Sequence, residues 1–254
     1  MEMKAVILAG GRGTRLSEET TSRPKPLVEA SGYPLLWHIM KNYESYGIRE
    51  FIVLVGYKGQ QIREYFANYW LHHSDVTFDL KSPDYVIHEN RSFPWKVTVL
   101  DTGLETNTGA RLKKISNHLK DDFLLTYGDG VADVDIGKLL AEHARSKNLV
   151  TLTAMQPPAR FGALTLENNQ VKEFTEKPEN EGAWVNGGFF AVKPDIFDYI
   201  GEENESFEIE VLPRIAKQRL LGVHKHYGFW QPVDTIRDLY RLEEAIAKGR
   251  LPWI

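Results

Sequence analysis

The stretch AVILAGGRGTRLSEETTSRPKPLVEASG, residues 5–32, determines the fold that we expect for this chain. It begins with five apolar residues, which is typical of a strand buried on both faces. It continues into a loop with glycines at positions 10, 11 and 13. A glycine-rich loop that leaves a buried strand can point several backbone N–H groups at one anion. The stretch therefore predicts an α/β sheet with an anion-binding loop at the carboxyl end of one strand.

Buried strands alternate with helices along much of the remaining sequence, which favours a mostly parallel sheet flanked by helices. We expect strands at 3–9, 50–56, 122–127, 149–155 and 183–192. We expect helices at 34–46, 58–70, 109–119, 136–146, 205–219 and 236–248. Residues 76–101 resemble irregular β structure, and residues 161–166 and 170–176 resemble a hairpin. No linker marks a domain break, so we expect one domain over 1–254.

Composition excludes several classes of protein. The 254 residues include no cysteine, which excludes disulfides, thiolate metal sites and a cysteine nucleophile. The apolar runs are far shorter than the roughly 20 residues of a membrane span, and we expect a cytoplasmic protein with no membrane partner. With 31 basic and 35 acidic side chains the net charge is −4, and no basic run predicts a nucleic-acid partner.

Four basic side chains lie in or just after the glycine-rich loop. Pro24 and Pro26 restrict the backbone on both sides of Lys25, and so limit where its ammonium group can move. The loop lacks the third glycine of the dinucleotide fingerprint and the Gly-Lys-Ser/Thr of the P-loop. A tight turn with solvated arginines is the alternative, but the basic cluster favours a phosphate site. The cluster consists of Arg12, Arg15, Arg23 and Lys25.

The segments LAGGRGTRL (8–16) and RPKPLVEASGYPLL (23–36) resemble the signature of the sugar-phosphate nucleotidyltransferases. Further stretches are similar in order and spacing to the glucose-1-phosphate cytidylyltransferase family over nearly the whole chain. They begin at Trp37 and end at Gly249, and include TGARLKKI (108–115), LLTYGDGVADVDI (124–136), NGGFFAV (186–192) and GFWQPVDTIRDLYRLEEAIAKG (228–249). The resemblance implies the nucleotide-diphospho-sugar transferase fold, with small β appendages on a Rossmann-like sheet.

The resemblance also implies a reaction. CMP would pass from CTP to α-D-glucose 1-phosphate, giving CDP-glucose and pyrophosphate for deoxysugars of surface polysaccharides such as O-antigen. Residues 1–155 would bind the nucleotide and residues 156–254 the sugar phosphate, with Mg²⁺ as cofactor. The implied catalytic residues are Lys25 at the reacting phosphorus, Arg15 at the β- and γ-phosphates, and Asp129. The implied nucleotide-binding residues are Leu8, Ala9, Gly10, Gly11, Arg12, Gly13, Thr14, Arg15, Lys25, Thr106, Arg111 and Gly128. Arg23 is assigned no role.

Two aspartates are ambiguous by themselves. Asp129 ends a buried strand within Gly-Asp-Gly, which is also a common turn. Asp234 precedes a capping box formed by Thr235 and Asp238, so it could belong to the helix start. The resemblance makes Asp129 and Asp234 a pair that holds Mg²⁺ through carboxylate oxygens.

The resemblance also places residues at the base and at the sugar. Arg111 would otherwise be a solvated helix arginine, but in the family the matching arginine contacts cytosine. Thr106 would lie near the same pocket. The implied sugar-phosphate residues are Glu176, Lys177, Asn186 and Gly187. Lys177 would orient the attacking phosphate.

The histidine pairs at 72–73 and at 224 and 226 have no carboxylate nearby in sequence, and we expect them at the surface or an interface rather than on a metal.

Alternatives remain open from the sequence. The same machinery could use UTP or dTTP, or another sugar phosphate, and a protein of this fold could be a non-catalytic nucleotide-sugar sensor. The resemblance implies a homo-oligomer, such as a hexamer. The aromatic-rich segment 65–95 is long for a connection inside a compact sheet, so we expect an interface there.

Overall fold

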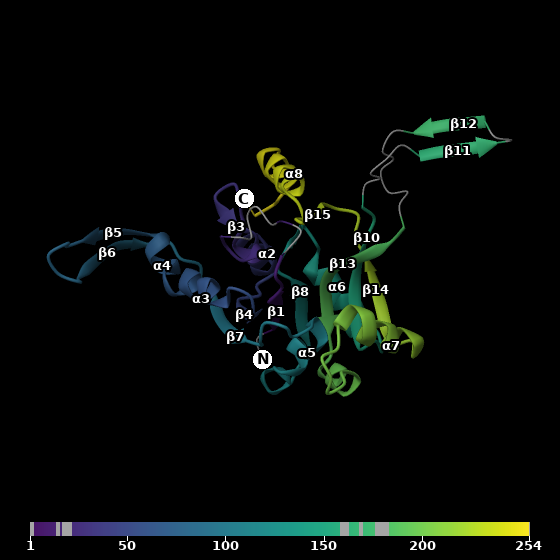
Figure 1. The fold of residues 1–254 in the computed structure, drawn as a ribbon, viewed down its shortest axis with the longest axis horizontal. Helices are drawn as coiled ribbons and strands as arrows, with labels where there is room; N and C mark the ends of the chain where they lie inside the picture. The colour runs from purple at the N-terminus through teal and green to yellow at the C-terminus, as the bar shows by residue number, and fades with distance from the viewer. Residues whose placement is uncertain are drawn as a thin grey trace.

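A seven-stranded sheet forms the centre of the molecule (Figure 1). The computed structural model describes residues 3–13, 16, 22–157, 163–167, 170–175 and 183–253. The strand order is β14-β10-β13-β8-β1-β4-β7, and β13 runs antiparallel to both of its neighbours while the other neighbouring pairs are parallel. The strands are β1 (Lys4–Ala9), β4 (Glu50–Val55), β7 (Lys96–Asp101), β8 (Phe123–Tyr127), β10 (Val150–Met155), β13 (Val185–Val192) and β14 (Leu221–Lys225). The expected mostly parallel sheet is confirmed.

Helices cover both faces of this sheet. Alternate residues of β1 point to opposite sides: Ala5, Ile7 and Ala9 belong to one buried cluster, and Val6 and Leu8 to the other. Helices α2, α6 and α8 contribute side chains to the first cluster, and α5 and α7 to the second. The helices are α2 (Leu35–Glu44), α3 (Gly59–Ala67), α4 (Tyr69–His72), α5 (Thr108–Lys113), α6 (Ile136–Ala144), α7 (Leu212–Lys217) and α8 (Ile236–Ala247).

Helix α2 begins and ends where the sequence predicts. Pro34 precedes its first residue, where a missing N–H costs no intrahelical hydrogen bond. Gly47 follows it with φ +80° and donates its N–H to the Glu44 carbonyl at 2.8 Å. This left-handed residue closes the helix C-terminus, as glycine commonly does.

Three of the expected helices are interrupted. The helix expected over 58–70 breaks at Asn68, whose side-chain amide donates to the Glu64 carbonyl at 2.9 Å and so competes with the helical pattern. The helix expected over 205–219 begins as a π-helix, Phe207–Val211, and continues as α7. Pro213 lacks the N–H that would continue an uninterrupted α-helix through this point. The helix expected over 109–119 ends its α-helical part at Lys113 and resumes as the 3₁₀ turn Ser116–His118.

The segment 76–101 was expected as irregular β structure, and that expectation is wrong for its last part. Strand β7 is the edge strand of the main sheet, in parallel register with β4 from Lys96–Glu50 to Asp101–Val55. Its alternating, half-exposed residues resemble those of a free hairpin because only one edge of the strand is paired. Strands β9 (Gly130–Ala132), β14 and β15 (Trp230–Pro232) were not expected from sequence, and two of them are only three residues long.

Two hairpins extend away from the body of the molecule in Figure 1. One pairs β5 (Ser74–Phe78) with β6 (Tyr85–Asn90), and the other pairs β11 (Ala163–Glu167) with β12 (Gln170–Thr175). The second confirms the expected hairpin over its described residues, while its turn at 168–169 lies outside them. A small ladder, β2 (Glu29–Ala30) with β3 (Tyr33–Pro34), precedes α2. In the described part of the chain, no helix is both long and apolar enough to cross a bilayer.

Candidate active site

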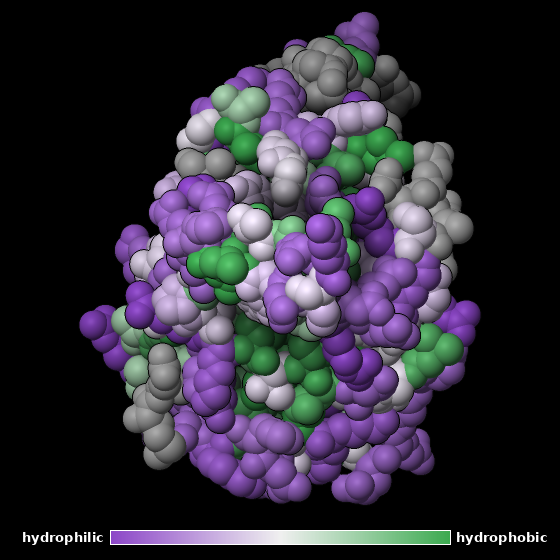
Figure 2. Space-filling view, turned by 90° about the vertical axis from the view of Figure 1, so that its left-hand side faces the viewer, coloured by the Kyte–Doolittle hydropathy of each residue, from purple (hydrophilic) through white to green (hydrophobic). Residues whose placement is uncertain are grey.

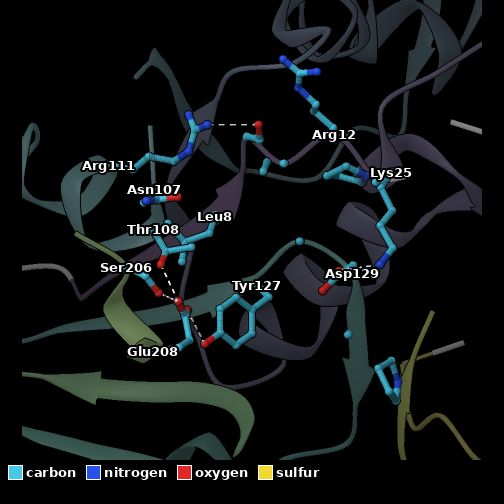
Figure 3. Close-up of a pocket in the computed structure, with 18 of the residues that line it drawn as sticks. Leu8, Arg12, Lys25, Asn107, Thr108, Arg111, Tyr127, Asp129, Ser206 and Glu208 are labelled. Carbon is cyan, nitrogen blue, oxygen red and sulfur yellow. Dashed lines mark hydrogen bonds and ion pairs between the residues drawn. The ribbon is translucent and has the colours of Figure 1, made fainter. Parts of the chain in front are cut away.

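A cavity of about 880 Å³ opens at the carboxyl ends of β1 and β8 (Figure 3). This is the edge of a parallel sheet at which α/β proteins bind their ligands. The cavity brings together residues that the sequence predicts from separate motifs. Those residues are Leu8, Ala9, Gly10, Gly11, Arg12, Gly13, Lys25, Thr106, Arg111, Gly128, Asp129, Asn186, Gly187 and Asp234. Thr14, Arg15, Glu176 and Lys177 lie outside the described residues.

Lys25 lies at the floor of this cavity between two carboxylates. Its Nζ is 2.7 Å from Asp129 Oδ2 and 2.7 Å from Asp234 Oδ1, and only 8% of the residue is exposed. Burial by itself lowers the pKa of Lys25, but the charges and hydrogen bonds of Asp129 and Asp234 outweigh it, so the pKa is raised. The ammonium group therefore stays charged and balances two aspartates that would otherwise repel each other.

Short strands bring the two aspartates together. Asp129 follows β8, and Asp234 follows β15 shortly before α8. Strand β15 pairs antiparallel with β9, and the Val233 N–H donates to the Asp129 carbonyl at 2.9 Å. The expected capping box of α8 is confirmed, with Asp238 serving as its acidic member. The helix start therefore uses Asp238, and the Asp234 carboxylate contacts Lys25.

Arg111 is buried, with 4% of the residue exposed, which excludes the solvated helix arginine considered as an alternative. Its Nη1 donates to Thr102 Oγ1 at 2.6 Å and to the carbonyls of Gly103 at 2.7 Å and Val55 at 3.1 Å. Its Nη2 donates to the carbonyls of Gly10 at 3.1 Å and Leu104 at 3.2 Å. One guanidinium group thus joins the glycine-rich loop, the end of β4 and the loop after β7.

The glycine-rich loop is shaped by this arginine. A Cβ on Gly10 would lie 2.3 Å from Arg111 Cζ, so no larger residue fits there without displacing the guanidinium.

Arg12 lies at the rim, 56% exposed, and pairs with Glu105. Arg23 pairs with Glu29 at 2.8 Å. Thr106 donates to the Thr102 carbonyl at 2.6 Å and accepts from Lys114 at 3.2 Å, which orders the loop opposite Arg12.

A second polar network lines the other side of the cavity, and of its members the sequence indicated only Asn186. Glu208, in the π-helix, accepts from Thr108 Oγ1 at 2.5 Å, Ser206 Oγ at 2.8 Å and the Tyr127 hydroxyl at 2.7 Å. Asn186 donates from Nδ2 to the Tyr127 oxygen at 3.1 Å, and Figure 3 shows Thr108, Ser206 and Tyr127 around Glu208. In sequence Glu208 is one of several glutamates on an expected helix face, so no local signal sets it apart. The π-helix, a form often found at functional sites, places it in the cavity.

The expectation of surface or interface histidines is wrong for the pair at 224 and 226. His224 is 6% exposed and lies 2.9 Å from Glu142 Oε2, and the His226 Nε2 lies 3.0 Å from Asp133 Oδ1. Tertiary packing supplies carboxylates that are distant in sequence. His72 is exposed as expected. Across the described residues, no group of three or more histidine or acidic side chains is arranged to hold a metal ion.

Comparison with known proteins shows which class of protein has this fold and this cavity. The sequence model of the family described as nucleotidyl transferase matches residues 4–249, and the chain belongs to that family. Among curated relatives, it is 52% identical to a glucose-1-phosphate cytidylyltransferase of Salmonella typhi, over 99% of this chain and 98% of the relative. It is 43% identical to a probable glucose-1-phosphate cytidylyltransferase of Bacillus subtilis, over 99% of both chains.

A solved structure supports the fold. A putative glucose-1-phosphate thymidylyltransferase from Bacillus anthracis superposes with a TM-score of 0.68, covering 98% of this chain and 95% of that one. The sequence identity is 20%, so this likeness concerns the fold alone. The expected nucleotide-diphospho-sugar transferase architecture is confirmed.

Proposed function

We propose that this protein is a glucose-1-phosphate cytidylyltransferase, which transfers CMP from CTP to α-D-glucose 1-phosphate and releases pyrophosphate. The 52% identity to an enzyme of that name over nearly the whole chain supports the assignment. The structural observation that carries it is the buried Lys25 with its Nζ 2.7 Å from both Asp129 and Asp234, in a cavity that also contains the glycine-rich loop. The product would supply the synthesis of surface polysaccharides.

The two aspartates fit a divalent cation. Both carboxylates already form an ion pair with the Lys25 ammonium group, which occupies the position that a metal ion would take between them. Oxygen ligands of this kind suit Mg²⁺, which takes few protein ligands and completes its shell with water and substrate phosphates. Asp129 and Asp234 would hold the ion. A bound Mg²⁺ would act as a Lewis acid that neutralises charge on the phosphates.

The chain's own residues would align the reacting groups and offset their charge. An oxygen of the sugar phosphate attacks the α-phosphorus of CTP, and the bond from that phosphorus to the bridging oxygen of the β-phosphate breaks. The attacking oxygen is already anionic, so no general base is needed. Lys25, freed from the aspartates, offsets charge at the α-phosphate. The glycine-rich loop with Arg15 holds the departing pyrophosphate, and Lys177 orients the attacking phosphate.

Arg111 and Thr106 would define the base pocket. Both terminal nitrogens of Arg111 donate to oxygens of the protein in this structure, so the guanidinium fixes the carbonyls of Gly10 and Leu104, two residues that line the cavity. Backbone carbonyls accept hydrogen bonds, and the exocyclic amino group of cytosine is a donor. This geometry supports CTP over UTP or dTTP, whose bases carry a carbonyl at the same ring position.

The choice of substrates is tested by a matrix of nucleotides and sugar phosphates. We expect CTP with glucose 1-phosphate to give kcat/KM about 5- to 150-fold above UTP or dTTP with the same sugar, because a buried acceptor left unpaired costs about 1–3 kcal/mol. Pyrophosphate release is the measurement. Equal rates with all three triphosphates would contradict a cytosine-reading pocket, and binding of CTP without turnover would support a sensor.

We also propose that the hairpin formed by β5 and β6 joins two copies of the chain in a homo-oligomer. It carries exposed apolar side chains, and Figure 2 shows hydrophobic residues among hydrophilic ones on the face from which it projects. An isolated two-stranded hairpin is marginally stable in water. The exposed side chains are Phe78 (55% exposed), Leu80 (96%), Tyr85 (44%), Val86 (58%) and Ile87 (40%).

The oligomer is tested by light scattering. Val86→Glu with Ile87→Glu would place one charge on each face of the hairpin, because neighbouring strand residues point to opposite faces, and is expected to reduce the molecular mass to that of the monomer. The same two charges added at exposed apolar residues outside the hairpin, Val223→Glu with Tyr240→Glu (54% and 66% exposed), should leave the mass unchanged. A monomeric parental protein at micromolar concentration would refute the proposal.

A further inference from the structure

The hydrogen-bond geometry around Glu208 fixes which groups of this network donate and which accept. A hydroxyl group has one hydrogen, and the hydroxyls of Thr108, Ser206 and Tyr127 all donate theirs to Glu208. The Thr108 oxygen also accepts from the Phe207 N–H at 2.8 Å, and the Ser206 oxygen from the Ile209 N–H at 3.2 Å. The hydroxyls of Thr108 and Ser206 thus make these hydrogen bonds within the protein. Tyr127 and Glu208 are the members of the network that offer lone pairs to the cavity.

Neither of these two groups can act as a donor there. The Tyr127 hydroxyl donates its hydrogen to Glu208, and the Tyr127 oxygen accepts a hydrogen bond from Asn186. A carboxylate has about four acceptor positions, and three on Glu208 are filled by neutral hydroxyls. Tyr127 and Glu208 therefore leave only acceptor positions, next to a negative charge, while the Asn186 amide beside them supplies N–H groups.

The two ends of the cavity thus differ in character. The Lys25 end combines the two aspartates, which would hold Mg²⁺, with an ammonium group and the glycine-rich loop, which suit phosphate oxygens. The Glu208 end would repel a phosphate but can accept a hydrogen bond from a neutral donor. In Figure 3 the Tyr127 hydroxyl points toward Glu208, and Asp129 lies beyond the other end of the ring. A substrate bound by its phosphates near Lys25 could extend a sugar ring toward Tyr127.

We propose that Tyr127 and Glu208 form a specificity-determining corner that accepts a hydrogen bond from one sugar hydroxyl of a substrate. Glu208 is the positioning residue, because it directs the hydroxyl hydrogen of Tyr127 away from the substrate. The inference rests on the proposed function for the identity of the substrates. The ribose of CTP and the hexose of the sugar phosphate are both polyols, and the experiment distinguishes them.

The test compares Tyr127→Phe and Glu208→Gln with the parental protein by isothermal titration and steady-state kinetics. Tyr127→Phe keeps the ring and removes only the hydroxyl. We expect the Kd and KM of one substrate to rise about tenfold, the value of one hydrogen bond, while those of the other change less than about twofold. Glu208→Gln should affect the same substrate. Tyr240→Phe and Glu244→Gln on α8, 66% and 63% exposed, are the matched controls.

Deoxy analogues identify the hydroxyl. Removing it, as dCTP for the ribose or a deoxyglucose 1-phosphate for the hexose, should weaken binding to the parental protein about tenfold and to Tyr127→Phe less than about twofold. Such coupling supports the proposal and names the sugar. Equal losses in both proteins for every analogue, or a lower kcat without any change in KM, would overturn it.

Failure of the proposed function gives a different result. A parental protein that binds CTP and glucose 1-phosphate without releasing pyrophosphate would refute the catalytic function. Titrations with the same deoxy analogues would still test whether Tyr127 and Glu208 accept a hydrogen bond from a sugar hydroxyl. Thermal unfolding of Tyr127→Phe and Glu208→Gln should show that both variants fold. If Glu208→Gln does not fold, the coupling measured with Tyr127→Phe decides the inference alone.

Discussion

Lys25→Met is expected to lower the rate of pyrophosphate release about 10³-fold, with the fold retained. The substitution keeps an unbranched side chain between Pro24 and Pro26 but removes the charge that would offset the α-phosphate in the transition state. Steady-state kinetics measures the loss, and circular dichroism with thermal unfolding checks the fold. Lys138→Met is the control, because Lys138 also pairs with an aspartate, at 2.9 Å from Asp135, but is 74% exposed.

The same variant should bind divalent cations more tightly before any nucleotide is added. In the parental protein the ammonium group is 2.7 Å from both Asp129 and Asp234, and its removal leaves two facing carboxylates without a cation. We expect Mn²⁺ affinity of the nucleotide-free protein to rise at least about tenfold, which corresponds to about 1.4 kcal/mol. The electron paramagnetic resonance signal of free Mn²⁺ reports this without reference to activity.

A second substitution makes this prediction specific. Adding Asp129→Asn to Lys25→Met should abolish the gain in Mn²⁺ affinity, because one of the two carboxylates is lost. If Lys25→Met binds Mn²⁺ no better than the parental protein, the two aspartates do not form a cation site that Lys25 occupies. That outcome would remove the structural support for Mg²⁺ binding by Asp129 and Asp234.

Arg111→Met is expected to destabilise the protein by about 2–4 kcal/mol and to raise the KM for CTP at least about tenfold. The change leaves the carbonyls of Gly10, Val55 and Gly103 without their common donor in a largely buried place. It also frees the glycine-rich loop from the loop after β7. Urea unfolding and CTP kinetics measure the two effects. Arg145→Met, on an exposed arginine after α6, should change neither.

Arg111→Lys separates charge from geometry. A single ammonium group keeps the positive charge but cannot reach the set of oxygens that the two terminal nitrogens of arginine contact. We expect most of the loss in CTP binding to persist in this variant. Full recovery with lysine would show that charge alone is needed, and would contradict the inference that Arg111 shapes the base pocket by holding backbone carbonyls.

Several features of the fold could be predicted because they depend on neighbours in sequence. Apolar runs marked β1, β4 and β8 as buried strands, and Pro34 and Gly47 marked the two ends of α2. The prolines around Lys25 and the capping box at Thr235 and Asp238 are also local devices. Edge strand β7 was misjudged, since pairing on one side only gives a pattern that a free hairpin shares.

The first strand, the glycine-rich loop and the restrained lysine follow from the sequence, because each is set by backbone preferences within a few residues. The contacts of Lys25 follow from the tertiary structure, since Asp129 and Asp234 are 104 and 209 residues away and meet it through the short β9–β15 ladder. The tertiary structure also decided that Arg111 is buried and that Glu208 orients Tyr127. Such contacts depend on strand pairing and helix packing between distant segments, which no local pattern records.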